Sequence, residues 1–363
     1  MEPMKAAASP PSPFLHPSVR IEMNSFSRLR FPSHPTFRHI PFPRTHASRT
    51  LPCTLAACAM FVAGGALAAY PDRPITMIVP FPAGAGTDIT ARNFGKCMEQ
   101  QMSASVVVMN RPGASGDIGL AALAQSAPDG YTLGIVNTPG VVSIPIERST
   151  KYTYKSFDFL GNVAEAPGTI SVHADSPIHT IQDLVAAARA KPDIVTVGTQ
   201  GVGSAGHISL LLLERAANIR FNMVPFQGAS PARAALLGKV IDGTMANVDE
   251  AVSFRVGAPW RILGVMSDSR SPISNELPTF KEAGYDIQAG SMRGFAGPKG
   301  MPPEVVGKLT SVIKTCVEDP EFRERAKKAY LPVRYLPPTE YVQSLQKLDA
   351  NLHELWKVKP WNQ

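Results

Sequence analysis

Short apolar runs rich in β-branched residues alternate along this chain with segments whose apolar residues recur at helical spacing. The first run, Ile75–Val79, is typical of a buried strand. It is followed by Ile89, Phe94, Met98 and Met102, whose spacing predicts a helix that ends near Met102. Repeated units of this kind indicate an α/β protein with parallel strands, which binds ligands beyond the carboxyl ends of its strands.

The same alternation continues to the C-terminus. Further strands are predicted over residues 106–109, 131–136, 157–162, 169–173, 195–197, 221–225, 241–245 and 261–266. Further helices are predicted over 115–126, 180–190, 207–217, 230–237, 278–283, 302–318, 320–328 and 339–356. No low-complexity linker interrupts the pattern, so two lobes would be joined by crossing strands and not by a tether.

The loop between the first strand and the first helix, residues 80–88, consists almost entirely of small residues. It offers few side chains, but it presents backbone N–H groups at the start of a helix, where donors lack partners and the helix dipole is positive. Such a site attracts carboxylate, phosphate or sulfate. The alternative interpretation is a tight connection in which Thr87 or Asp88 only caps the helix.

A second glycine-rich helix start contains Gly201, Gly203 and Gly206 in GxGxxG spacing after a strand. A dinucleotide site would also need an acidic residue at the end of the next strand, and residues 221–227 contain none. The segment therefore predicts a second anion site without a nucleotide cofactor. His207, next to it, is interpreted as a capping or packing residue, or alternatively as a donor in the pocket.

Arg293 lies among small and apolar residues, which leaves two interpretations open. It is either a buried partner in a structural ion pair or a clamp for a ligand carboxylate. Asp242, Asp249 and Glu250 near a strand end are interpreted as solvated or capping groups and not as an acid/base pair. The sequence has no P-loop, HExxH or GxSxG motif, so we predict no catalytic residues and no metal or cofactor site.

The net charge of +7 at first suggests a nucleic-acid-binding protein. However, residues 1–68 contain seven of the 36 basic residues and only two of the 29 acidic ones, so the remainder carries only about +2. No basic patch is interleaved with aromatic residues, and nucleic acid is therefore not an expected partner.

Residues 1–68 resemble a leader followed by a secretory signal peptide. The first 50 residues are rich in Pro, Ser, Arg and His and have no apolar period. An apolar run over 51–68 then ends in Ala66-Leu67-Ala68, which predicts cleavage after Ala68 and export to the periplasm. The alternatives are a membrane anchor formed by the same run and lipidation at Cys58.

Several stretches of the mature chain match one family in order. They include Pro80–Asp88, residues 107–114, 129–133, 198–207 and 224–228. In these stretches the chain resembles the extracytoplasmic substrate-binding proteins of tripartite tricarboxylate transporters, of the TctC or Bug type. The resemblance implies a two-lobed periplasmic binding protein (Venus-flytrap) fold with lobe I at 70–170 and 293–363 and lobe II at 171–292.

The resemblance also implies a ligand site in the cleft between the lobes. Small carboxylates are expected to bind there, largely through backbone amides. The predicted ligand-binding residues are Phe81, Pro82, Ala83, Gly84, Ala85, Gly86, Thr87, Asp88, Thr138, Thr199, Gln200, Gly203, Ser204, Ala205, His207, Gln227, Asn247 and Arg293. The chain departs from the family pattern at Ala85, where a glycine is usual, and at Ala246, where many members have aspartate.

The family layout places Cys97 and Cys316 on helices of the same lobe. An exported protein meets an oxidising compartment, where these residues could form a disulfide. Alternatively, Cys97 packs as a free thiol beside the apolar stripe of its helix.

The function predicted from the resemblance is that of a monomeric, non-catalytic periplasmic receptor. It would deliver a small carboxylate to the large and small membrane subunits of a transporter. The alternatives are a secreted α/β enzyme that acts on a carboxylate, and a sensory protein that presents its ligand to a histidine kinase.

Overall fold

The computed structural model describes residues 70–361 of the 363-residue chain. The chain divides into two units, residues 1–63 and 64–363, and all described residues belong to the second. The predictions on the leader, the cleavage site and Cys58 lie outside the described residues. Within 70–361, no helix combines the length and the apolar character needed to cross a membrane.

The strands form one mixed, ten-stranded sheet. Its main path runs β2-β1-β3-β9-β4-β7-β5-β6, and β8 and β10 each pair with β4. The strands are β1 (Ile75–Val79), β2 (Val106–Asn110), β3 (Thr132–Asn137), β4 (Phe157–His173), β5 (Thr196–Thr199), β6 (Asn222–Pro225), β7 (Gly243–Asn247), β8 (Trp260–Val265), β9 (Gly290–Pro298) and β10 (Val333–Leu336). The expected parallel strands are present in two groups, β2-β1-β3 and β7-β5-β6, but β4 and β9 are antiparallel to their neighbours.

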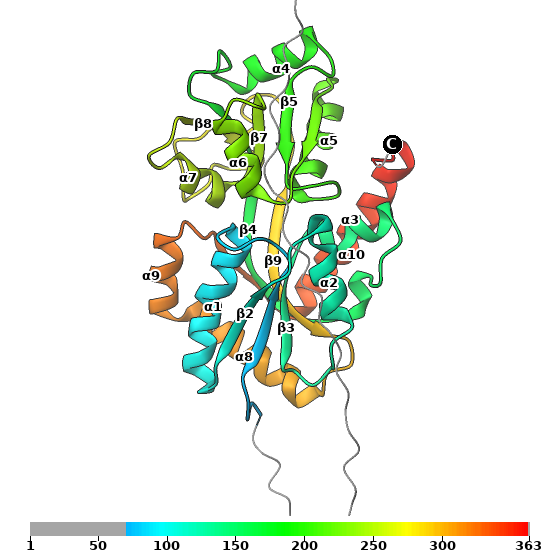
Figure 1. The fold of residues 1–363 in the computed structure, drawn as a ribbon, viewed down its shortest axis with the longest axis vertical. Coiled ribbons are helices and arrows are strands. Elements are labelled where there is room, and N and C mark those ends of the chain that lie inside the picture. The colour runs from blue at the N-terminus through cyan, green and yellow to red at the C-terminus, as the bar shows by residue number, and fades with distance from the viewer. Residues whose placement is uncertain (1–69, 362–363) are drawn as a thin grey trace, which may run out of the picture. The chain divides into compact units, whose positions relative to one another are not determined.

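The prediction of two separate strands at 157–162 and 169–173 is wrong, because these residues belong to one continuous strand, β4. Its first part, Phe157 to Pro167, pairs with β9, and from Gly168 onward it pairs with β7 and β8. Figure 1 shows β4 and β9 running from the elements around β1 to those around β7. We call the group around β1–β3 the first lobe and the group around β5–β7 the second lobe.

The helices of the first lobe come from both ends of the described chain. Helix α1 packs against α8 and α9, and α10 packs against α3 and β4. The helices are α1 (Gly86–Met102), α2 (Asp117–Ala124), α3 (Gly140–Glu147), α4 (Ile181–Ala190), α5 (Ala205–Ala217), α6 (Ala229–Leu237), α7 (Val248–Arg255), α8 (Pro303–Glu318), α9 (Pro320–Lys328) and α10 (Pro338–Val358). Short 3₁₀ turns occur at Ala114–Gly116 and Tyr154–Ser156.

Each lobe has its own apolar core. The first lobe buries Phe94, Phe295 and Phe322 between the sheet and helices α1, α8 and α9. The second lobe buries a separate cluster between the sheet and α4 and α5. The predicted two-lobed α/β fold with crossing strands is therefore confirmed. The boundaries at 170/171 and 292/293 stay a prediction, because both fall inside strands β4 and β9.

One predicted helix is wrong, and four elements were not predicted. Residues 278–283 form turns, and Thr279 makes an isolated bridge to Val265. The elements not predicted are α3, α7, β9 and β10. Helix α3 contains Pro145, and β9 reads as a glycine-rich loop, so neither has a regular apolar period.

Cys97 on α1 and Cys316 on α8 are joined by a disulfide. Their Cα atoms are 5.8 Å apart, and both side chains are fully buried. The pairing therefore settles the alternative that the sequence left open, and it links two helices that are 219 residues apart.

Candidate functional site

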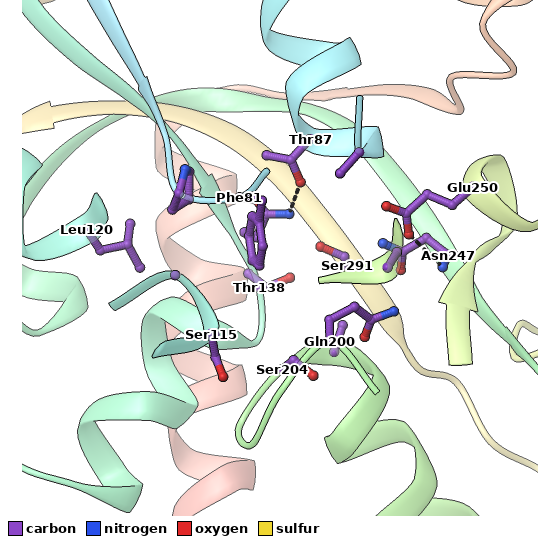
Figure 2. A pocket seen from close by; sticks show the side chains of 17 residues that line it. Phe81, Thr87, Ser115, Leu120, Thr138, Gln200, Ser204, Asn247, Glu250 and Ser291 are labelled. Carbon is purple, nitrogen blue, oxygen red and sulfur yellow. Dashed lines mark hydrogen bonds between the residues drawn. The ribbon is translucent and has the colours of Figure 1, made fainter. Parts of the chain in front are cut away.

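A pocket lies between the two lobes and is lined by residues from both. The space between its lining residues amounts to about 550 Å³, part of which is open solvent. Figure 2 shows Leu120 and Glu250 on opposite sides of it. The lining residues are Pro80, Phe81, Ala85, Thr87, Ser115, Gly116, Leu120, Asn137, Thr138, Gly140, Gln200, Ser204, Ala205, Ala229, Asn247, Glu250 and Ser291.

The loop before α1 forms part of the first-lobe wall. Its tip is exposed, and the N–H of Gly84 donates to Asp88 Oδ2 at 2.9 Å. Burial acts to raise the pKa of Asp88, but the hydrogen bonds from Arg92, Gly84 and Asn110 outweigh it and hold the pKa below its ordinary value. Asp88 therefore braces the loop from outside the pocket, whereas Thr87 lies in the lining.

Thr87 also holds a second lining residue. Its hydroxyl accepts a hydrogen bond of 2.8 Å from Asn137 Nδ2, drawn as the dashed line in Figure 2. This bond orients the amide of Asn137, whose Oδ1 is buried and has no hydrogen-bond partner among the described residues. The amide oxygen of this lining residue is thus a buried acceptor without a partner among the described residues.

The start of α5 forms part of the second-lobe wall. Ser204 caps the helix by accepting from the N–H of His207, and Gln200 Oε1 accepts from the N–H of Gly206. The N–H of Ala205 has no acceptor within the helix, because it belongs to the first turn. Ser204 and Ala205 both line the pocket, so a hydroxyl and a backbone N–H are available to an anion there.

His207 supports the same loop from outside the pocket lining. Its Nδ1 accepts a hydrogen bond of 3.1 Å from the N–H of Gly203, and the side chain is buried. Burial, with a smaller contribution from Lys359, lowers the pKa of His207 to about 4. The imidazole is therefore neutral at pH 7 and supports the loop, as the packing interpretation predicted.

The connection from β7 to α7 carries the carboxyl group of the pocket. Asn247 and Glu250 form a capping box, in which Glu250 Oε2 accepts from the N–H of Asn247 at 3.2 Å. Glu250 Oε1 accepts from the N–H of Gly86, the first residue of α1, at 3.0 Å. Burial and then the neighbouring Asp249 raise the pKa of Glu250.

Arg293 lies beneath this connection and is completely buried. Its guanidinium contacts Asp249 through Nη1–Oδ2 at 2.5 Å and Nη2–Oδ1 at 3.3 Å. Arg293 does not line the pocket. Of the two interpretations of this arginine, the structure contains the ion pair.

The structure brings eight of the 18 predicted ligand-binding residues into the lining. These are Phe81, Ala85, Thr87, Thr138, Gln200, Ser204, Ala205 and Asn247. Ten others lie outside it, in supporting or exposed positions: Pro82, Ala83, Gly84, Gly86, Asp88, Thr199, Gly203, His207, Gln227 and Arg293.

Sequence reasoning missed Glu250 and Asn137 among the lining residues. The three-residue spacing from Asn247 to Glu250 is a capping-box signal that could have found the start of α7. Asn137, at the end of β3, follows the rule that ligands bind beyond the carboxyl ends of strands.

The sequence profile of the tripartite tricarboxylate transporter family receptor (TctC) matches residues 90–354. The chain belongs to this family. It is 30% identical to protein BugT of Bordetella pertussis over 274 residues, which cover 73% of this chain and 84% of BugT.

Solved structures show the same architecture. The periplasmic binding protein BugD is 31% identical, with a TM-score of 0.74, and the match covers 79% of this chain and 98% of BugD. The Rhodopseudomonas palustris protein Rpa4515, solved with adipate, is 26% identical, with a TM-score of 0.74 and coverage of 79% and 97%. The predicted periplasmic binding protein fold is therefore confirmed.

Proposed function

We propose that this chain is a periplasmic receptor that captures a small carboxylate between its lobes for a tripartite tricarboxylate transporter. The observation that carries the proposal is the pocket itself, to which the first turn of α5 contributes the N–H of Ala205 and the hydroxyl of Ser204. The adipate bound to the similar protein from R. palustris supports a carboxylate as the ligand class.

The receptor acts by binding and lobe closure, without catalysis. Among the described residues, the hydrogen bonds of Ser204 and His207 are made with backbone groups, so the two do not form a nucleophile and base pair. We further propose that the signal peptide is cleaved after Ala68, that the exported protein is a monomer, and that its partners are the large and small membrane subunits.

Mass spectrometry of the ligand released from the purified periplasmic protein tests this function. A thermal-shift series of mono-, di- and tricarboxylates, with sugars and simple amines as controls, provides the second arm. We expect a carboxylate to be released and at least one carboxylate to raise the melting temperature. A protein that responds to none of them, or only to a control compound, would contradict the proposal.

A further inference from the structure

The side of the pocket formed by α7 carries the carboxyl group of Glu250. Burial and Asp249 raise the pKa of this group, whereas Arg293 and two backbone N–H groups favour its charged form. The carboxylate of Glu250 lines the pocket, and each of its oxygens accepts one backbone N–H, from Gly86 and Asn247. A carboxylate has about four acceptor positions, so about two remain open. Figure 2 shows this carboxyl group beside Asn247, on the side nearest Ser291.

The described lining itself contains no Lys, Arg or His. The nearby guanidinium of Arg293 is engaged by Asp249, at 2.5 Å. Two carboxyl groups therefore share one buried cation. A ligand carboxylate brought to this side would meet Glu250 without a compensating charge, and like charges so placed are strongly unfavourable.

The start of α1, which the sequence predicted as an anion site, already binds carboxyl groups of the protein itself. The N–H of Gly86 donates to Glu250, and the N–H of Gly84 donates to Asp88. Of the two glycine-rich helix starts, α5 is the one whose first turn keeps the Ala205 N–H and the Ser204 hydroxyl at the pocket. The first turn of α5 is therefore suited to a ligand carboxylate.

The first lobe contributes Asn137 to the lining, with a second acceptor that has no partner in the described part of the chain. Asn137 Oδ1 is buried without a hydrogen-bond partner, and its amide is fixed by the bond to Thr87. An unsatisfied buried acceptor is costly unless a ligand or water supplies a donor. Glu250 and Asn137 can thus each accept a further hydrogen bond from a donor on the ligand.

We infer that the ligand carries a single carboxylate, held at the first turn of α5, and a hydrogen-bond donor, an amide or an ammonium, that Glu250 and Asn137 accept. The inference rests on the proposed function and narrows its ligand class to donor-bearing monocarboxylates. Glu250 is the residue that discriminates against a second carboxylate.

Isothermal titration calorimetry of the purified exported protein at pH 8 tests this inference. The probes are succinate, glutarate and adipate, the monoamide of each, and the ω-amino acids of matching length. The two members of each dicarboxylate–monoamide pair have nearly the same shape and differ in one charged end. We expect a monoamide or an ω-amino acid to bind about tenfold or more tighter than the matching dicarboxylate.

Glu250→Gln removes the charge with little change of shape, but it keeps one acceptor oxygen and so loses one of the two backbone hydrogen bonds. Glu304→Gln, in the first turn of α8, is the matched control. We expect the preference to collapse to about threefold or less in Glu250→Gln and to persist in the control. If the wild-type protein binds the dicarboxylate as tightly as its monoamide, the inference is wrong while the carboxylate function stands. If no carboxylate of any kind binds, both are wrong.

Discussion

Next to the pocket, Gly86 packs closely against Arg293, Asp249 and Glu250. Gly86 lies so close to its neighbours that a Cβ atom there would be 2.7 Å from Arg293 Nη2 and 2.8 Å from Asp249 Oδ2. The absence of a side chain therefore allows the start of α1 to reach Glu250. Small residues in this loop predicted close approach to an anion, but the sequence could not show that the anion belongs to the protein.

Arg293→Ala tests whether the arginine is a structural counterion. The substitution would leave two buried carboxyl groups without a cation, which should lower the free energy of unfolding of the ligand-free protein by about 3–5 kcal/mol. Urea denaturation measures this loss. Lys357→Ala, which removes an exposed pair with Glu354, is the control and should change stability by less than about 1 kcal/mol. Normal stability combined with lost affinity would instead make Arg293 a ligand clamp.

His207 should make stability depend on pH. Its pKa is about 4 in the folded protein, compared with the ordinary value of 6.5, so the unfolded chain takes up the proton first as the pH falls. The stabilisation is complete above about pH 6.5 and is lost progressively as the pH falls from 6.5 toward 4, by about 3 kcal/mol in total.

His207→Gln lacks this titration and serves as the comparison. The difference in unfolding free energy between the two proteins, measured by urea denaturation from pH 7 to pH 4, should shrink as the pH falls. Parallel curves would show that the histidine is not held neutral by burial.

At the scale of helices and strands, elements with capping residues and a regular apolar period in their own sequence were predicted. Elements that depend on pairing with distant segments were not. Helix α4 has a capping box at Thr180 and Asp183 and a regular apolar stripe, and its predicted range agrees closely with the structure. Strand β9 has a glycine-rich sequence, and it is a strand because it lies between β3 and β4. The pocket was predicted where it depends on glycine-rich helix starts, and it was missed where it depends on pairings between distant segments.

Gly290→Ala probes the point where β9 begins, beside the change of partners in β4. A Cβ atom there would lie 2.3 Å from the carbonyl oxygen of Ala166 and 2.8 Å from Pro167 Cα, both backbone atoms that cannot move aside cheaply. We expect a loss of about 2–4 kcal/mol in unfolding free energy. Gly307→Ala, in α8 with open space around it, is the control and should be neutral or slightly stabilising.

The disulfide between Cys97 and Cys316 also acts at this scale, because it fastens α1 to α8. It closes a loop of 219 residues, and the unfolded chain loses more entropy when a longer loop is closed. Replacing both cysteines by serine should therefore cost about 2–5 kcal/mol. Peptide mapping without reductant should recover the two cysteine peptides as one linked species. Two separately alkylated peptides would contradict the bond.

At the scale of the whole described structure, two side-chain contacts join α5 and its preceding loop to the first lobe. Ser143 on α3 donates to the carbonyl oxygen of Gly203, and Lys359, just after α10, pairs with Glu214 on α5. Glu214 is buried, and Lys359 is about one-third exposed. These partners are 60 and 145 residues apart, so no local pattern could have predicted them. We expect both contacts to form only when the lobes lie close together, so that these contacts and ligand binding stabilise each other.

Lys359→Glu tests this coupling, because it places a negative charge opposite Glu214 only when the lobes are closed. Ligand affinity should fall about tenfold, mainly through faster dissociation, while the melting temperature of the ligand-free protein changes little. Lys357→Glu makes the same charge change two residues away, where the lysine pairs only with Glu354 on its own helix among the described contacts. Titration calorimetry and stopped-flow dissociation on the two variants measure the difference. Equal affinities would show that the pair between Lys359 and Glu214 does not contribute to closure on the ligand.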